Sequence, residues 1–273
     1  MLTDITVGQY FPGNSIIHRL DPRLKLVLVI AFITAVFMAG NAASLSIMLL
    51  FLITLIALSR VKARMYIKST KAILPIIIMT SVLNAIYVNT GTLLWEWGVI
   101  KIWSGGVTRA VYMTLRIIML ILSSAMLTYT TSPTELTDGI ERLLSPLKWI
   151  GLGNHVHTLA MMMTIALRFI PTLIEETDKI MSAQKARGAD MESGNLIKRV
   201  KSLMPVLIPL LISSFRRAAE LADAMECRCY TGGKGRTRMK QLRLALRDFA
   251  GLLVMACITA AVVLCNIFIM LPF

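Results

Sequence analysis

The stretch Leu26–Ser59 reads LVLVIAFITAVFMAGNAASLSIMLLFLITLIALS and contains no Asp, Glu, Lys or Arg. A helix needs about 20 apolar residues to cross the hydrocarbon core of a bilayer, so this run is too long for one crossing. The segment Gly40–Ser44, which contains Gly, Asn and Ser, interrupts it near the middle. We therefore expect a tight hairpin of two membrane-spanning helices, near residues 22–40 and 43–59.

Three further uncharged runs extend this pattern along the chain. They cover Ala72–Trp95, Ile117–Thr134 and Phe249–Phe273, and each is about as long as one crossing requires. They predict helices near residues 69–88, 107–131 and 246–271, which makes five spans in total. The sequence thus predicts an all-α membrane protein. Asp21 and Pro22 are typical of a helix start, and Arg23 and Lys25 are expected to reach the lipid headgroups.

The composition agrees with a membrane protein and excludes several other classes. Of 273 residues, 56% are hydrophobic and 16% charged, and the mean hydropathy is +0.70. A soluble domain has about 45–50% apolar and roughly 25% charged residues. Lys and Arg (29) outnumber Asp and Glu (15), for a net charge of +14, but a nucleic-acid binder would not carry such long apolar runs. Four cysteines are too few for a secreted disulfide scaffold of this length.

The distribution of basic residues predicts the orientation, because Lys and Arg favour the cytoplasmic side. With a cytoplasmic N-terminus, the inner side holds three of them before or at the first span, five in Arg60–Lys71 and eighteen between Thr131 and Arg247. The outer side holds Lys101 and Arg109 only, and Arg116 lies within a span. We expect the N-terminus inside and the C-terminus outside.

The outer loop Asn89–Gly106 carries three tryptophans and a Gly105–Gly106 turn. Trp95, Trp97 and Trp103 predict a short β-like hairpin at the membrane interface, where tryptophans act as anchors. Ligand binding by these aromatic side chains is the alternative.

The region between the fourth and fifth spans is apolar but repeatedly charged. It contains two long helical patterns, 155–186 and 197–230, with the uncharged runs Val156–Leu167 and Ser202–Phe215 of 12 and 14 residues. Runs this short favour interfacial or protein-buried helices over spans. With a shorter helix at Leu136–Leu144, they predict three amphipathic cytoplasmic helices. The expected domains are residues 1–131 with four spans, 132–245 with these helices, and 246–273 with the last span.

The two long helices end alike. The first closes on Ala186-Arg187-Gly188 and the second on Cys227-Arg228-Cys229, each about two turns after an acidic patch. An arginine at a helix C-terminus can simply stabilise the helix dipole. Its small neighbours would also let a partner surface approach closely enough for the guanidinium to reach carboxylates or carbonyls. Two such endings on successive long helices indicate two equivalent docking points for two similar partners.

These residues carry a resemblance to a known family. The chain resembles the transmembrane (T) components of energy-coupling factor transporters, which take up vitamins and metals in prokaryotes. Ala186-Arg187-Gly188 matches the first of that family's two Ala-Arg-Gly motifs, and Cys227-Arg228-Cys229 occupies the place of the second. The opening segments Gln9–Ser15 and His18–Leu26 also resemble the family's N-terminal motif. Cysteine replaces both small residues of the second motif, which raises the question whether position 229 needs the backbone conformation of a glycine.

The resemblance implies a coupling role. Two ATP-binding-cassette ATPases would each bind one arginine motif, and a membrane-embedded substrate-binding (S) component would rest on the spans and on the long helices. ATP and Mg²⁺ would be held by the ATPases, and this chain would bind no cofactor. Pro171, Pro205 and Pro209 would give the helices flexibility, and Met161, Met162 and Met163 would form an adaptable contact surface or pack against lipid. The expected location is the prokaryotic cell membrane.

Catalytic and metal-binding patterns have little support. The three histidines, His18, His155 and His157, form no metal-binding or catalytic motif, and Cys227 and Cys229 would need further ligands to hold a metal. Arg116 would contact the S component or find a carbonyl partner. The alternative functions are a stand-alone secondary carrier or membrane enzyme, or a conventional ABC permease.

Overall fold

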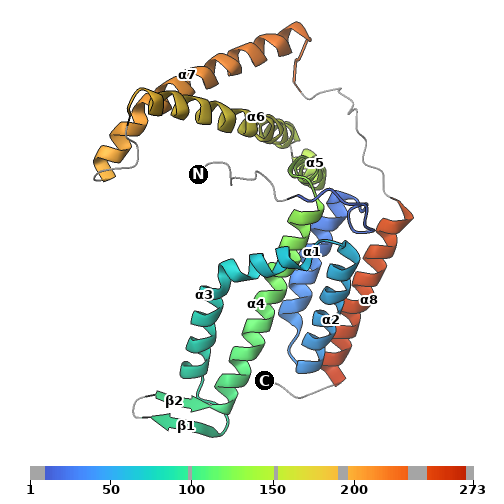
Figure 1. Ribbon diagram of the computed structural model, residues 1–273. Helices are drawn as coiled ribbons and strands as arrows, with labels where there is room; N and C mark the ends of the chain where they lie inside the picture. Colours follow the sequence, from blue (N-terminus) through green and yellow to red (C-terminus); the bar gives the residue numbers. More distant parts are fainter. Residues whose placement is uncertain (1–9, 98–99, 151–152, 190–195, 233–244, 269–273) are drawn as a thin grey trace. The chain divides into compact units, whose positions relative to one another are not determined.

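The computed structural model describes residues 10–97, 100–150, 153–189, 196–232 and 245–268. Within these ranges the chain forms eight α-helices, one 3₁₀ helix and a two-stranded hairpin (Figure 1). The elements in chain order are α1 (Pro22–Met38), α2 (Ala42–Ser59), α3 (Ala63–Tyr87), β1 (Leu93–Trp97), β2 (Ile100–Trp103), α4 (Ser104–Thr130), α5 (Pro133–Leu143), η1 (Ser145–Ile150), α6 (Gly153–Ala186), α7 (Leu196–Cys227) and α8 (Leu246–Phe268).

The chain divides into two compact units, which are described separately. The first, here called the membrane unit, consists of Gln9–Gly139 together with Lys240–Phe273. The second, here called the helix-pair unit, is formed mainly by Ile140–Met239. The division falls within α5.

The membrane unit contains the five helices expected to span, α1, α2, α3, α4 and α8. Their ends lie within three residues of the expected ones, except that α3 begins at Ala63 instead of residue 69. The extra turns carry the exposed side chains of Arg64 and Lys68, which an uncharged-run criterion leaves out. The expectation of an all-α membrane protein is confirmed.

Among the described residues, six helices are long and apolar enough to cross a membrane: α2, α3, α4, α6, α7 and α8. At 17 residues, α1 lies at the lower end of the roughly 17–25 residues that suffice for a span. The six include α6 and α7, because each has a stretch with few charges. That these two helices lie outside the bilayer therefore stays a prediction.

The core of the membrane unit is formed by α1, α2, α4 and α8. Its buried side chains include Phe32, Val36, Met48, Met119 and Val262. Lipid tails are as apolar as these side chains, so close van der Waals packing, rather than exclusion of water, holds the helices together. Gly106 shows how close the packing is, because a Cβ there would lie 2.8 Å from the carbonyl oxygen of Ala85 on α3.

Two cations join α1 and α4 at opposite ends, in contacts we call the α1–α4 clasps. Lys25, 4% exposed, donates from Nζ to the carbonyl of Thr130 (2.9 Å) and to Oγ1 of Thr131 (3.2 Å) at the end of α4. Arg116 donates from Nη2 to the carbonyl of Ala39 (2.9 Å) at the end of α1. Each cation thus lies at the C-terminus of the other helix, where the helix dipole is negative.

The α1–α4 clasps test two predictions made from the sequence, one for Lys25 and one for Arg116. The prediction that Lys25 reaches the lipid headgroups is wrong, because its side chain is buried and its ammonium group donates to three oxygen atoms of the protein. For Arg116, the carbonyl partner is confirmed.

The start of α8 is fastened to the same end of the unit as Lys25. The buried Asp248 carboxylate accepts from the backbone N–H of Asp21 (3.0 Å) and of Ala245 (2.7 Å). Asp21 is itself the N-cap of α1 and accepts from the N–H of Arg23 (3.0 Å), as predicted. We call this the Lys25 end of the membrane unit.

At the opposite end, β1 and β2 form an antiparallel hairpin before α4. The expected β-like hairpin is confirmed, but Gly105 and Gly106 do not form its turn, because both lie in the first turn of α4. Residues 98–99, between the two strands, lie outside the described residues. Trp103 is half-buried, and its role as an interface anchor stays a prediction.

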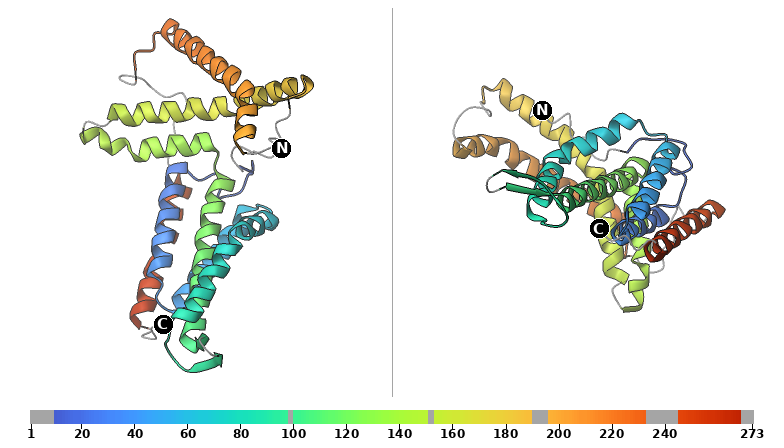
Figure 2. Two further views of the ribbon diagram at one scale, coloured as in Figure 1. Left: turned by 90° about the vertical axis from the view of Figure 1, so that its left-hand side faces the viewer. Right: turned by 90° about the horizontal axis from the view of Figure 1, so that it is seen from below.

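The helix-pair unit consists of the end of α5, the 3₁₀ helix η1, and the long helices α6 and α7. Figure 2 shows α6 and α7 crossing, with a change of direction along α7. Pro205 and Pro209 lie inside α7 and Pro171 inside α6. A proline removes a backbone hydrogen bond and clashes with the preceding turn, which explains the bend in α7.

Candidate functional site

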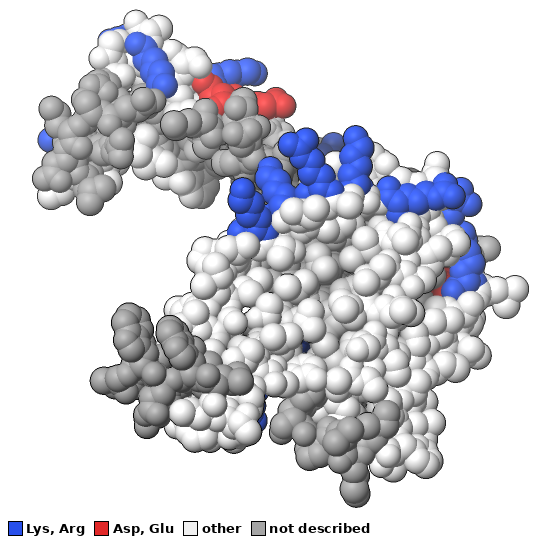
Figure 3. All heavy atoms as spheres, turned by 60° about the horizontal axis from the view of Figure 1, so that its bottom comes forward, with Lys and Arg blue, Asp and Glu red and all other residues white. Residues whose placement is uncertain are grey.

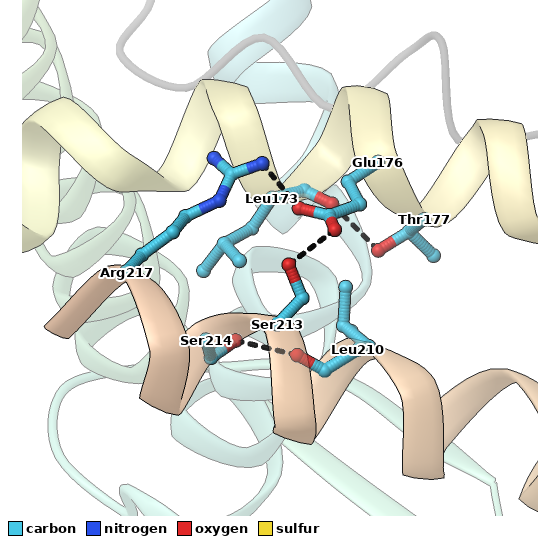
Figure 4. Close-up of polar contacts among 7 residues, drawn as sticks. All are labelled: Leu173, Glu176, Thr177, Leu210, Ser213, Ser214 and Arg217. Carbon is cyan, nitrogen blue, oxygen red and sulfur yellow. Dashed lines mark hydrogen bonds and ion pairs between the residues drawn. The ribbon is translucent and has the colours of Figure 1, made fainter. Parts of the chain in front are cut away.

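The two long helices meet at a polar contact centred on Glu176 (Figure 4). Its carboxylate on α6 accepts from Nη2 of Arg217 on α7 at 2.5 Å and from the hydroxyl of Ser213. The side chains of Arg217 and Glu176 are 31% and 21% exposed, so the pair is only partly screened by solvent. Glu176 is therefore turned toward α7, although the sequence groups it with its neighbours in one acidic patch.

The helices run antiparallel. One contact joins Glu176 to Arg217, and another joins Met161 to Tyr230, whose hydroxyl donates to the methionine sulfur at 2.9 Å. Moving back along α6 thus corresponds to moving forward along α7. The C-terminal ends of the two helices consequently lie at opposite ends of the pair.

The two arginine motifs are placed evenly about the Glu176–Arg217 contact. Arg187 lies 11 residues beyond Glu176, and Arg228 lies 11 residues beyond Arg217. At 1.5 Å per residue, each motif is on the order of 16 Å of helix from the contact, in opposite directions. The pair thus presents two similar ends with a near two-fold relationship.

The backbone at both ends has the same hydrogen-bonding pattern. On α6, the N–H of Gly188 donates to the carbonyl of Lys185, and the N–H of Ala189 donates to the carbonyl of Gln184, each at 3.0 Å. On α7, the N–H of Cys229 donates to Glu226 (2.8 Å) and that of Tyr230 to Met225 (3.0 Å). These are two Schellman motifs, in which Arg187 and Arg228 occupy the C-cap position.

The residue after each arginine has a left-handed backbone. Gly188 has φ 83° and Cys229 has φ 54°. Glycine adopts such angles freely, whereas a residue with a Cβ is strained by about 1–2 kcal/mol. Position 229 does take the conformation that favours glycine, and the cysteine there tolerates it.

The motif side chains face outward. Ala186, Arg187, Gly188, Cys227, Arg228 and Cys229 are all exposed. Within the described ranges neither Arg187 nor Arg228 forms an ion pair. The two guanidinium groups are thus accessible to another molecule from opposite ends of the helix pair.

The other predicted contact residues differ in accessibility. Met162 and Met163 are exposed, as are Pro171, Pro205 and Pro209. Met161 is half-buried because its sulfur faces Tyr230 within the unit. The three methionines therefore do not form one continuous surface.

A surface that the sequence analysis did not single out runs along α7. Its exposed apolar side chains recur every three or four residues, which places them on one face of the helix. The opposite face carries Val206, Ser213 and Arg217, two of which contact Glu176. The apolar face, here called the α7 apolar face, consists of Ile197, Val200, Met204, Ile208, Leu211 and Phe215.

The described residues contain no group of three or more His, Cys, Asp or Glu that could hold a metal ion. His157 pairs with Glu141 at 3.1 Å. His18 donates from Nε2 to the carbonyl of Phe11 (3.0 Å), and its Nδ1 lies 2.6 Å from the hydroxyl oxygen of Ser15. Burial lowers the pKa of His18 below the usual 6.5.

Comparison with known proteins identifies relatives over most of the chain. The family model described as cobalt transport protein, CbiQ, matches residues 13–239. A protein of Acidaminococcus fermentans is 52% identical over 257 residues, covering 94% of this chain and 95% of its own length. One of Clostridium kluyveri is 50% identical (95% and 97% covered), and one of Bacillus subtilis is 46% identical (89% and 91%). All three are named energy-coupling factor transporter transmembrane protein EcfT.

Proposed function

Because the chain belongs to the CbiQ/EcfT family of energy-coupling factor transporter transmembrane proteins, we propose that it couples two ABC ATPases to a membrane-embedded S component. The observation that carries the proposal is the pair of matching helix ends, each with an exposed C-cap arginine. ATP-driven motion of the ATPases would pass through α6 and α7 to the S component. That component would select the cargo, a vitamin or another micronutrient.

The helix ends suit two similar partners. Each arginine is flanked by small residues, so a partner groove can approach the backbone closely. A guanidinium group forms two parallel hydrogen bonds to a carboxylate, which makes its position specific as well as attractive. The antiparallel arrangement keeps the two arginines apart, so two ATPase subunits can bind without competing for one surface.

The charges of α6 and α7 favour a position on the cytoplasmic side. Arg168 interrupts the apolar stretch of α6 and Arg216 that of α7; both are exposed, and neither forms an ion pair with a residue that the structure describes. Charged side chains within a bilayer are expensive unless they are paired. The N-terminus would then be cytoplasmic and the C-terminus outside, as the distribution of basic residues predicts.

The α7 apolar face would meet the S component or the lipid beside it. It lies opposite the face that contacts α6, so a partner can cover it without disturbing the Glu176 contact. Nucleotide hydrolysis would belong to the ATPases, which would hold ATP and Mg²⁺. This chain would be a non-catalytic subunit of the prokaryotic cell membrane.

The test is a mild-detergent pull-down of the tagged chain from its own membranes, with uptake measured in parallel. The variants are Arg187→Glu, Arg228→Glu and both together, and Arg216→Glu is the matched control because it reverses an exposed arginine away from the helix ends. We expect the wild type and the control to retain two ATPases and a small membrane subunit. The double variant should lose the ATPases and uptake while remaining inserted.

Three results would contradict the proposal. One is a double variant that retains both ATPases and normal uptake. Another is a wild-type chain that purifies alone and still moves or modifies a substrate in liposomes, which would favour a carrier or an enzyme. A homodimer that transports without an S component would instead indicate a conventional permease.

A further inference from the structure

A groove at the Lys25 end of the membrane unit is lined by residues to which the proposed coupling assigns no role. Its volume of about 530 Å³ lies within the range of about 300–1,000 Å³ that is typical of small-molecule sites. Four helices and the N-terminal segment contribute to its walls. The lining is almost entirely apolar and includes Leu20, Leu28, Phe32, Phe51, Leu55 and Met126.

The groove has a cationic group at its edge. Arg247, in the first turn of α8, lines it and is exposed. Arg247 forms no ion pair with any residue that the structure describes. The neighbouring Asp248 carboxylate accepts instead from two backbone N–H groups. Lys25 also lines the groove, but its ammonium already donates to three oxygens. Arg247 is thus the cation available to a ligand.

The surrounding surface is basic as well. Tyr129 at the end of α4 contacts Tyr66 and Ser69 of α3, so the start of α3 lies at the Lys25 end. Figure 3 shows Lys and Arg gathered along one edge of the otherwise largely uncharged membrane unit. The acids Asp21 and Asp248 at this end are buried, and Glu135 is half-buried. The exposed basic residues of this end are Arg19, Arg60, Lys62, Arg64, Lys68, Lys71 and Arg247.

We propose that the groove binds an anionic phospholipid, with one acyl chain between the helices and the phosphate on Arg247. The apolar walls match the chain, and the cationic edge matches the headgroup. Bilayer lipid surrounds the membrane unit, so the ligand is present at high concentration and needs no route through water. The site is independent of the arginine motifs and goes beyond the coupling role.

The test is native mass spectrometry of the purified full-length chain in mild detergent, with phosphatidylglycerol or phosphatidylethanolamine added at equal concentration. Thr54→Trp places a large ring at a position that lines the groove, whereas Ile53→Trp changes an exposed neighbour that does not. We expect one retained phosphatidylglycerol in the wild type and in Ile53→Trp, and at least a fivefold loss of the bound form in Thr54→Trp.

A second pair of variants tests the headgroup contact. Arg247→Gln should reduce the preference for phosphatidylglycerol by about fivefold, which corresponds to about 1 kcal/mol for one arginine near anionic lipid. Arg64→Gln, an exposed cation that does not line the groove, should leave the preference unchanged. Equal retention by the two tryptophan variants, an unchanged preference in Arg247→Gln, or a bound polypeptide in place of lipid would overturn the proposal.

Discussion

The left-handed backbone at Cys229 predicts that glycine would strengthen the end of α7. A residue with a Cβ at φ 54° is strained by about 1–2 kcal/mol, and glycine removes that strain. Glycine also loses about 0.5–1 kcal/mol more conformational entropy on folding. For Cys229→Gly we therefore expect a net stabilisation of the helix end by about 0.5–1 kcal/mol, or roughly two- to fivefold in its opening equilibrium.

Amide hydrogen exchange at Tyr230 measures this effect. Its N–H donates to the carbonyl of Met225 at 3.0 Å, so exchange requires the helix end to open. Cys229→Gly should slow exchange at Tyr230 about two- to fivefold. Cys229→Ala is the control, because alanine loses the thiol but keeps the Cβ and should leave the rate nearly unchanged.

The reverse substitution can be made at the Ala186-Arg187-Gly188 motif. Gly188→Cys should speed exchange at Ala189 by a similar factor, because the backbone there has φ 83°. No heavy atom lies within 4 Å of the position a Cβ would take, so steric contact with neighbouring atoms does not contribute to the effect. Equal effects of Cys229→Gly and Cys229→Ala, or slower exchange in Gly188→Cys, would refute the reasoning.

Three further predictions concern other contacts. Glu176→Gln should weaken the α6–α7 contact by about 1 kcal/mol, a modest loss because both side chains of the ion pair are partly exposed. The distance distribution between spin labels at positions 187 and 228 should broaden in this variant, whereas it should not change in Glu175→Gln. Arg116→Met should lower the thermal stability of the chain in detergent by about 1–2 kcal/mol because the carbonyl of Ala39 loses its donor, and the exposed Arg109→Met serves as the control. The lowered pKa of His18 means that the folded state binds a proton on this side chain less readily than the unfolded state does. The contribution of His18 to folding stability is therefore fully present above pH 6.5 and is lost as the pH falls from there through the folded pKa. Thermal stability measured against pH should show this loss in the wild type and lack it in His18→Gln.

The spans were predictable because they depend on composition within one segment. An uncharged run such as Leu26–Ser59 excludes most alternatives, and the interruption at Gly40–Ser44 places its turn. The start of α3 was predicted six residues too late for the same reason, because its first turns carry the exposed charged side chains of Arg64 and Lys68. A criterion based on the absence of charged residues finds the uncharged part of a helix and not its whole length.

Contacts between distant segments were beyond the sequence. Lys25 follows a helix start, and local rules place such a cation at the headgroups. Two of its three acceptors, however, lie 105 and 106 residues further along the chain. Glu176 likewise stands in an acidic run, and only the antiparallel packing of α7 distinguishes it from Glu175. The likeness of the two helix ends was visible in the motifs, whereas the left-handed angle at Cys229 came from the backbone.

The α1–α4 clasps have a consequence for biosynthesis. When α1 leaves the ribosome, the carbonyl of Thr130 that will accept from Lys25 does not yet exist. Until α4 arrives, the ammonium keeps its hydration at the bilayer surface, and the free carbonyl of Ala39 at the other end of α1 has no donor from Arg116. Arrival of α4 supplies both partners at once, so the first hairpin matures only when the fourth helix is inserted. A nascent chain that stops before α4 therefore lacks two of the three acceptors of Lys25 and the donor to the carbonyl of Ala39.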